Sequence, residues 1–329
     1  MDFGVEFVPK DPVRTIVGYA KTADKLGFDF MWITDHYNNR NVYATLASIA
    51  RETREIRLGP GVTNPYTIHP AETASSIATI DELSGGRAVL GIGPGDRTTL
   101  NALGMKWEKP LTRVKESIKR IRDLLEGESV TSEEGEEFNL RGCRLNFSPE
   151  RKIPIYIGAQ GPNMLKMAAS CGDGILINAS HPRDFEYAIE RVKEGTKEAG
   201  RNLSDVDVAA YTSFSVGEDK TSAKESVIPP VAFIVAGVPE KVLERHEISS
   251  DNASEIKEAL SKGDFGAAFG AVTSKMINVF SICGTPNECI ERIRELKKIG
   301  VSQLVVGSPI GPDKKNSMKI ISEDIKPAF

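Results

Sequence analysis

The sequence is poor in cysteine, tryptophan and histidine, with four, two and four residues of these types among 329. The cysteines are scattered, and no two of them have the C-x-x-C spacing. A disulfide framework and a structural zinc site are therefore not expected. Because no second histidine lies at a metal-ligand spacing, we expect no metal site of any other kind.

Long apolar runs and an excess of basic charge are also missing. No uninterrupted apolar stretch approaches the roughly 20 residues of a membrane span, and the N-terminus lacks the pattern of a signal peptide. The net charge is -4, with no basic stripe. We therefore predict a cytoplasmic protein that binds neither membranes nor nucleic acid.

Hydrolase signatures are absent too. The Gly-Ser-Pro at 307–309 is the nearest approach to a nucleophile elbow, and it lacks the G-x-S-x-G pattern. None of the cysteines lies in a recognisable nucleophile motif. A Ser-His-Asp or cysteine hydrolase is therefore disfavoured.

What the sequence does contain is a regular alternation of short apolar strands and amphipathic helices. Hydrophobic residues make up 40% and charged residues 27%, as in a globular protein. The expected strands lie at 3–8, 28–33, 56–62, 87–91, 153–157, 174–178, 206–211 and 303–306. Eight strands is the count of a (β/α)8 barrel, although the rhythm alone does not separate a barrel from an open parallel sheet.

Two segments interrupt the alternation. The first, at about 126–152, is polar and predicts a small hairpin, whereas the second, at about 222–281, has mostly helical patterns. The second is too long to be a loop without structure of its own. We therefore expect a single domain over 1–329 that carries one small polar insertion and one helical insertion.

The third strand ends more abruptly than the others. Gly59, Pro60 and Gly61 break it, and Thr63 and Asn64 follow. Glycine permits close approach by a ligand, and proline removes a backbone donor. This end therefore suits a flat ring with a polar edge, or it is an ordinary strand-to-helix turn.

Acidic residues mark the ends of the first two strands. Glu6 lies within an otherwise apolar strand, so it is either a desolvated general acid in the barrel interior or a carboxylate in a structural ion pair. Asp35 and His36 follow the second strand and could hold the edge of a cofactor or cap the next loop. The residue pattern leaves both pairs of alternatives open.

Two strand ends are rich in glycine. The segment 91–95 is a poor match to a dinucleotide fingerprint, because Pro94 intrudes and Arg97 stands where a glycine is needed. Gly158, Ala159 and Gln160 precede a predicted helix, whose first N–H groups suit a phosphate. The two segments indicate a phosphorylated ligand, unless they are only tight turns.

Six stretches together carry a resemblance to a known family. They are GVEFVP at 4–9, WITDHYNN at 32–39, LGPGVTNP at 58–65, LGIGPGD at 90–96, IGAQGP at 157–162 and GSPIGPDK at 307–314. Over nearly its whole length the chain resembles the coenzyme F420-dependent methylenetetrahydromethanopterin reductases, which are bacterial-luciferase-like barrels.

The resemblance implies a TIM barrel with insertions, a homodimer or homotetramer, and a cis peptide bond at Gly61–Val62 behind the deazaflavin ring. The implied reaction is hydride transfer from reduced F420 to methylenetetrahydromethanopterin. Glu6 would be the acid and Asp96 a second catalytic group that orients the pterin. The implied cofactor-binding residues are Asp35, His36, Gly61, Val62, Thr63, Gly158, Ala159, Gln160 and Asn178.

Three other readings compete with this one. The first is another enzyme of the superfamily, such as an F420-dependent alcohol or sugar-phosphate dehydrogenase or an FMN monooxygenase. The second is a barrel that binds flavin without turnover, and the third is a barrel with no ligand. Glu6 and Asp96 favour the pterin reductase, and the glycine-rich strand ends disfavour a barrel without a ligand.

Overall fold

The computed structural model describes residues 1–329, and its internal contacts separate the chain into two compact units. The larger unit comprises residues 2–177 and 188–209, and the smaller comprises residues 1, 178–187 and 210–329. Three elements run from one unit into the other, namely β6 (Gly174–Asn178), α7 (Pro182–Glu198) and β7 (Asp207–Val216).

The larger unit alternates strands with helices. Its strands are β1 (Asp2–Phe7), β2 (Phe30–Ile33), β3 (Arg57–Pro60), β4 (Leu90–Ile92), β5 (Ile155–Gly158) and β6 (Gly174–Asn178). Its helices are α1 (Val13–Lys25), α2 (Val42–Ala50), α3 (Pro70–Ser84), α4 (Arg97–Ala102), α5 (Pro110–Leu125) and α6 (Pro162–Cys171). The pairs β1–β2, β2–β3, β4–β5 and β5–β6 are parallel, and single parallel bridges link β3 with β4.

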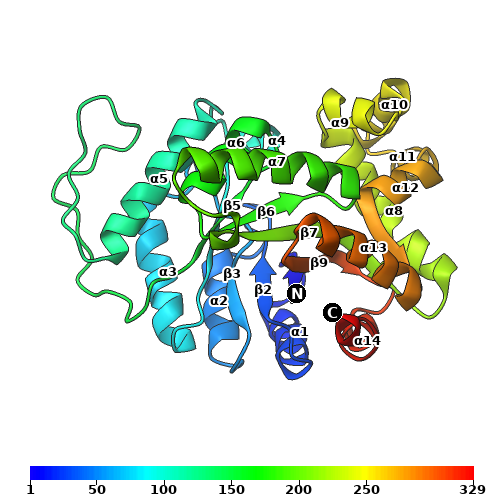
Figure 1. Cartoon of the computed structure of the whole chain (residues 1–329), viewed down its shortest axis with the longest axis horizontal. Coiled ribbons are helices and arrows are strands. Elements are labelled where there is room, and N and C mark those ends of the chain that lie inside the picture. The colour runs from blue at the N-terminus through cyan, green and yellow to red at the C-terminus, as the bar shows by residue number, and fades with distance from the viewer. The chain divides into compact units, whose positions relative to one another are not determined.

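The helices of this unit follow one another around the strands. Helices α1, α2, α3 and α5 each contact the next (Figure 1). In α1 the buried residues Ile16, Ala20 and Ala23 recur at spacings of four and three, which places them on one face. Helix α3 starts at Pro70, where proline needs no N–H, and ends at Gly85 with a positive φ of 71°. The helices thus present apolar faces to the strands and leave the strand ends free for loops.

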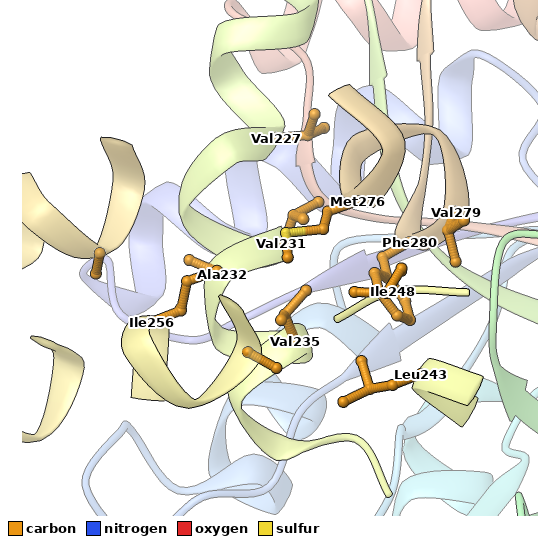
Figure 2. Packing of buried hydrophobic residues seen from close by; sticks show 12 residues of the cluster. Val227, Val231, Ala232, Val235, Leu243, Ile248, Ile256, Met276, Val279 and Phe280 are labelled. Carbon is orange, nitrogen blue, oxygen red and sulfur yellow. The ribbon is translucent and has the colours of Figure 1, made fainter. Parts of the chain in front are cut away.

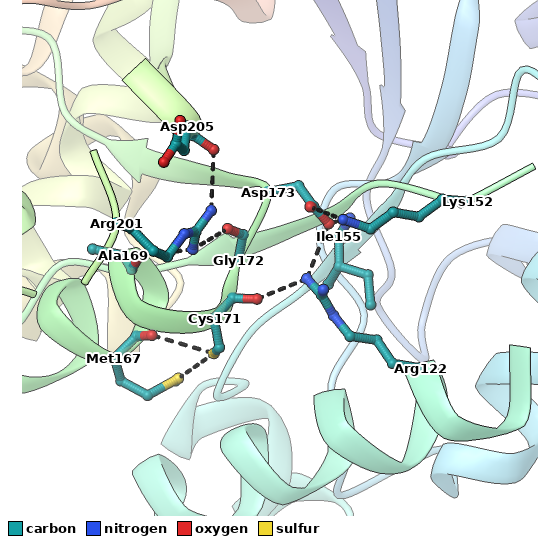
Figure 3. Close-up of polar contacts among 10 residues, drawn as sticks. All are labelled: Arg122, Lys152, Ile155, Met167, Ala169, Cys171, Gly172, Asp173, Arg201 and Asp205. Atoms are coloured by element: carbon teal, nitrogen blue, oxygen red, sulfur yellow. Dashed lines mark hydrogen bonds and ion pairs between the residues drawn. The ribbon is translucent and has the colours of Figure 1, made fainter. Parts of the chain in front are cut away.

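A set of polar contacts fixes the connection from α6 to β6 (Figure 3). The guanidinium of Arg122 donates to the Cys171 carbonyl at 2.7 Å and to the Asp173 carboxylate at 3.0 Å. Arg201 donates to the carbonyls of Ala169 and Gly172, each at 2.8 Å. These bonds satisfy carbonyls at the end of α6 that have no partner within the helix. The Asp173 carboxylate also accepts from the Ile155 N–H at 2.9 Å, which links the start of β5 to the same contacts.

The smaller unit contains three strands and most of the remaining helices. The strands are the end of β7, β8 (Ser281–Gly284) and β9 (Gln303–Ile310), and β7 lies between the other two. The helices are α8 (Lys220–Gly237), α9 (Glu240–Arg245), α10 (Ser250–Ser261), α11 (Phe265–Gly270), α12 (Ser274–Phe280), α13 (Pro286–Ile299) and α14 (Lys314–Ile320).

Helices α8 to α12 pack around a core of their own. Figure 2 shows Val231, Val235, Met276 and Phe280 pointing toward one another in this cluster, which is buried throughout. Helix α8 contacts α10, α11 and α12 and also strands β8 and β9, so its apolar residues are buried on more than one side.

Buried charges tie α9 to the first turn of α7. The Asp184 carboxylate accepts from Arg245 Nη1 at 2.7 Å and contacts His246 Nε2 at 2.9 Å. Burial acts to raise the pKa of Asp184, but hydrogen bonds from His246 and Arg245 outweigh burial and lower this pKa. His181 stacks edge-on against His246 at 4.8 Å, and burial lowers the pKa of His181 to about 4. The cluster is a structural clamp within this unit.

The structure differs from the sequence prediction in three places. Strand β8 and helix α4 were not expected, and the hairpin predicted within 126–152 is reduced to one antiparallel bridge between Val130 and Cys143. Strand β8 has four residues, and it is defined by its pairing with β7 rather than by its own pattern. No helix of the chain is both long enough and apolar enough to cross a lipid bilayer.

Candidate functional site

Glu6 is the most deeply buried carboxylate among the candidates. It lies near the end of β1, directly opposite Trp32 of β2, and its residue surface is 5% exposed. A carboxyl group in such a position can serve as an acid only if its surroundings support the neutral form. The location is therefore consistent with the general-acid role considered above.

Asp35 and Thr63 form the central polar contact of the site. Thr63 follows β3 and donates from Oγ1 to Asp35 Oδ2 at 2.7 Å, and Thr63 itself is fully buried. Burial raises the pKa of Asp35, whereas the bond from Thr63 opposes the rise. The partner of Asp35 is thus a hydroxyl from the neighbouring strand end, and the adjacent His36 is exposed to solvent.

Sequence reasoning missed Tyr43, whose hydroxyl lies close to this contact. This hydroxyl is buried, faces the hydroxyls of Thr63 and Thr73, and lies near the Asp35 carboxylate. Burial raises the pKa of this phenol. Nothing in the sequence marks Tyr43, because an aromatic residue in the first turn of a helix is usually part of the core.

The segment after β3 forms a bulge that leads into Thr63. The Gly61–Val62 peptide bond is cis, as the resemblance implied. Gly61 N–H donates to the Ile33 carbonyl at 2.8 Å, and Thr63 N–H donates to the Gly91 carbonyl at 3.0 Å. These bonds fix the bulge between the ends of β2 and β4. Val62 itself is half-buried.

The turn after β5 offers fewer free backbone donors than its sequence suggests. The N–H of Ala159 donates to the Leu176 carbonyl at 3.1 Å and thereby extends the sheet. Gln160 is exposed, and α6 starts two residues later at Pro162, which has no N–H. The residues just inside the helix add N–H groups that have no partner within it.

Asp96 and Asn178 lie at the remaining strand ends. Asp96 is exposed and caps α4, because its Oδ1 accepts from the Thr99 N–H at 2.8 Å. One oxygen of its carboxylate therefore has a structural role. Asn178 is the exposed last residue of β6 and belongs to the smaller unit. No group of three or more His, Cys, Asp and Glu side chains is arranged to hold a metal ion.

Comparison with known proteins decides the family. The model of the luciferase-like monooxygenases matches residues 2–303. A 5,10-methylenetetrahydromethanopterin reductase from Methanolobus tindarius is 54% identical over 326 residues, with 99% of each chain covered. The reductase of the same name from Archaeoglobus fulgidus is also 54% identical, over 331 residues and 99% of each chain. This chain belongs to the 5,10-methylenetetrahydromethanopterin reductase family.

A solved structure of this family confirms the fold. The coenzyme F420-dependent tetrahydromethanopterin reductase from Methanopyrus kandleri superposes with a TM-score of 0.96 at 45% identity, covering 100% of this chain and 99% of the other. The chain therefore has the luciferase-like (β/α)8 TIM-barrel fold, as the resemblance implied. More distant F420-dependent glucose-6-phosphate dehydrogenases, such as that of Rhodococcus hoagii, are 28% identical over 98% of this chain.

Proposed function

We propose that this chain reduces 5,10-methylenetetrahydromethanopterin to 5-methyltetrahydromethanopterin with reduced coenzyme F420, reversibly, in methanogenesis from CO2. The observation that carries the proposal is the 54% identity over 99% of the chain to reductases of that name. The glucose-6-phosphate dehydrogenases of the same superfamily are only 27–28% identical.

The residues at the strand ends fit a flat ring with polar edges. The half-buried Val62 offers an apolar face, and Asp35 offers a carboxylate that the fully buried Thr63 holds through its hydroxyl. The buried Tyr43 hydroxyl lies behind them, beside the hydroxyls of Thr63 and Thr73. A deazaflavin bound here supplies the hydride.

Glu6 is the proposed general acid. The methylene carbon bridges two nitrogens in a five-membered ring and is a poor hydride acceptor until one of those nitrogens is protonated and the ring opens. Glu6 would give its proton to that nitrogen, and its burial keeps competing water away. Asp96 would orient the pterin with the oxygen that does not cap α4.

The remaining candidates would hold the cofactor. We assign Asp35, His36 and Asn178 to the edge of the deazaflavin ring and Gly61 and Val62 to its face. Thr63, which is fully buried, would act on the ring edge through its bond to Asp35. The turn of Gly158, Ala159 and Gln160 would hold the phosphate, with the Ala159 N–H excluded as a donor because it serves the sheet.

We also propose a single barrel domain with insertions at about 126–152 and 222–281, a cytoplasmic location, and a homodimer or homotetramer. A net charge of -4 agrees with a protein that does not bind nucleic acid. Size-exclusion chromatography with light scattering tests the oligomeric state.

A substrate panel separates the proposed reaction from its rivals. The protein is mixed anaerobically either with reduced F420 and methylenetetrahydromethanopterin, or with oxidised F420 and one of isopropanol and glucose 6-phosphate. We expect the 420 nm band to respond only with the pterin. A response with isopropanol or glucose 6-phosphate would move the chain to a dehydrogenase, and binding of F420 without turnover would make it a flavin-binding barrel.

A further inference from the structure

At two positions beside the bulge, glycine is required because a Cβ atom would not fit, and not because of the backbone conformation. Neither Gly93 nor Gly158 has a positive φ, so an L-residue could adopt either backbone. A Cβ atom built on Gly93 would lie 2.8 Å from Val62 Cγ2, and one built on Gly158 would lie 3.3 Å from the same methyl group. The two Cα atoms therefore line a slot that the Val62 side chain fills.

Other glycines of the strand ends have a different reason to be glycine. A Cβ atom on Gly59 would meet the Val89 carbonyl oxygen at 1.8 Å, and one on Gly91 would meet the Pro60 carbonyl oxygen at 2.2 Å. Those contacts are with backbone and cannot be relieved by another substitution. At Gly93 the next nearest atom after the Val62 methyl is 3.7 Å away, so this contact involves one side chain only.

We propose that Gly93 and Gly158 are positioning residues, whose bare Cα atoms form a slot that sets the height of the Val62 side chain beneath the deazaflavin ring. This inference rests on the proposed function, because it needs F420 to bind at the bulge. It assigns these glycines to packing of the bulge, in addition to any contact of Gly158 with phosphate.

The geometry predicts unequal effects at the two positions. An ordinary van der Waals contact begins at 3.4 Å, so a methyl group at Gly93 must displace the Val62 side chain by more than half an ångström. At Gly158 the required shift is only about a tenth of an ångström. A methyl group at Gly93 would push the Val62 side chain out of the slot. With F420 bound at the bulge, as proposed, this displacement would move Val62 toward the ring.

The test is a double-mutant cycle in the whole protein with Gly93→Ala, Val62→Ala and the pair together. Isothermal titration with oxidised F420 gives the affinity, steady-state kinetics give kcat and both KM values, and thermal melting gives stability. Gly93→Ala should weaken F420 binding about tenfold to a hundredfold, with little change in the KM for the pterin. Gly158→Ala should have a smaller effect.

Val62→Ala removes the methyl groups that the new Cβ would meet. The double variant should therefore bind F420 no more weakly than Val62→Ala alone. Gly18→Ala is the control, because Gly18 has open space around it and lies in α1. It should leave all the kinetic constants unchanged.

Each contrary outcome overturns the inference. If Gly93→Ala binds F420 normally, the slot does not position Val62. If it binds weakly and Val62→Ala does not relieve the loss, the glycine is needed for direct approach of the ligand. If Gly93→Ala alone does not fold, the variant that combines it with Val62→Ala is measured instead. The slot predicts that this double variant folds, and a double variant that does not fold would contradict the slot. If the unmodified protein does not bind F420, the proposed function is refuted instead. Thermal melting of the two single variants and the double variant would then still test whether Gly93 packs against Val62.

Discussion

Replacement of Thr63 by valine tests the central polar contact of the site. Valine has nearly the shape of threonine, so the change removes the hydroxyl that donates to Asp35 Oδ2 at 2.7 Å and leaves the packing intact. Burial already raises the pKa of Asp35, and the Thr63 bond opposes that rise. Without the bond, the pKa of Asp35 must rise further.

The stability that Thr63→Val loses can be estimated from the usual contribution of a hydrogen bond to a charged group. Such bonds contribute about 1.5–3 kcal/mol, and a half-buried carboxylate places the loss at the lower end of that range. Because the pKa of Asp35 is raised in the folded state, ionising the carboxyl costs stability as the pH rises through that pKa. The loss caused by Thr63→Val is therefore full at neutral pH and disappears in acid, where Asp35 is protonated.

The assay is the pH dependence of kcat/KM for reduced F420. If the ionised carboxylate of Asp35 accepts a hydrogen bond from the ring edge, the acidic limb of the profile should move toward neutral pH in Thr63→Val. Thr45→Val is the matched control, because Thr45 is fully buried and donates to the Asn41 carbonyl at 2.8 Å, away from Asp35. An acidic limb that does not move in Thr63→Val would remove Asp35 from cofactor binding.

Three further predictions concern the acid and the clamp between α7 and α9. Glu6→Gln should bind F420 normally and lose about 10²- to 10⁴-fold in kcat, and near-normal turnover would exclude Glu6 as the acid. Asp184→Asn should lower the free energy of unfolding in urea by about 3 kcal/mol, because it leaves Arg245 and His246 without their buried partner; an unchanged midpoint would show that the clamp is dispensable. The pKa of His181 is about 4 in the folded protein, so the free energy of unfolding should fall as the pH drops from about 6.5 to 4. For this half-exposed group we expect a fall of about 1 kcal/mol, and His181→Gln should reduce it.

The alternation of strands and helices could be predicted from the sequence because each helix has its own apolar stripe and each strand its own short apolar run. In α1, Ile16, Ala20 and Ala23 carry that pattern without reference to the rest of the chain. Strand β8 could not be found in this way. Its four residues form a strand because they pair with β7, where Ser281 lies opposite Ser213.

The site was predicted less completely than the fold. The sequence analysis placed Asp35 and Thr63 at the ends of successive strands, and the structure adds that the two are hydrogen-bonded although they are 28 residues apart. The hydrogen-bonding state of each group could not be predicted. The Ala159 N–H belongs to the sheet, one oxygen of Asp96 caps a helix, and the Tyr43 hydroxyl lies buried beside Asp35. These facts depend on the positions of partners that are distant in sequence.

The most direct test of the account follows the transferred hydrogen. Reduced F420 labelled with deuterium at the position of hydride transfer is mixed anaerobically with the protein and unlabelled methylenetetrahydromethanopterin, and the methyl product is analysed by mass spectrometry. We predict a product that carries one deuterium in its methyl group, formed together with the 420 nm band. A methyl product without deuterium, or growth of the band that does not require the pterin, would contradict hydride transfer between these two substrates.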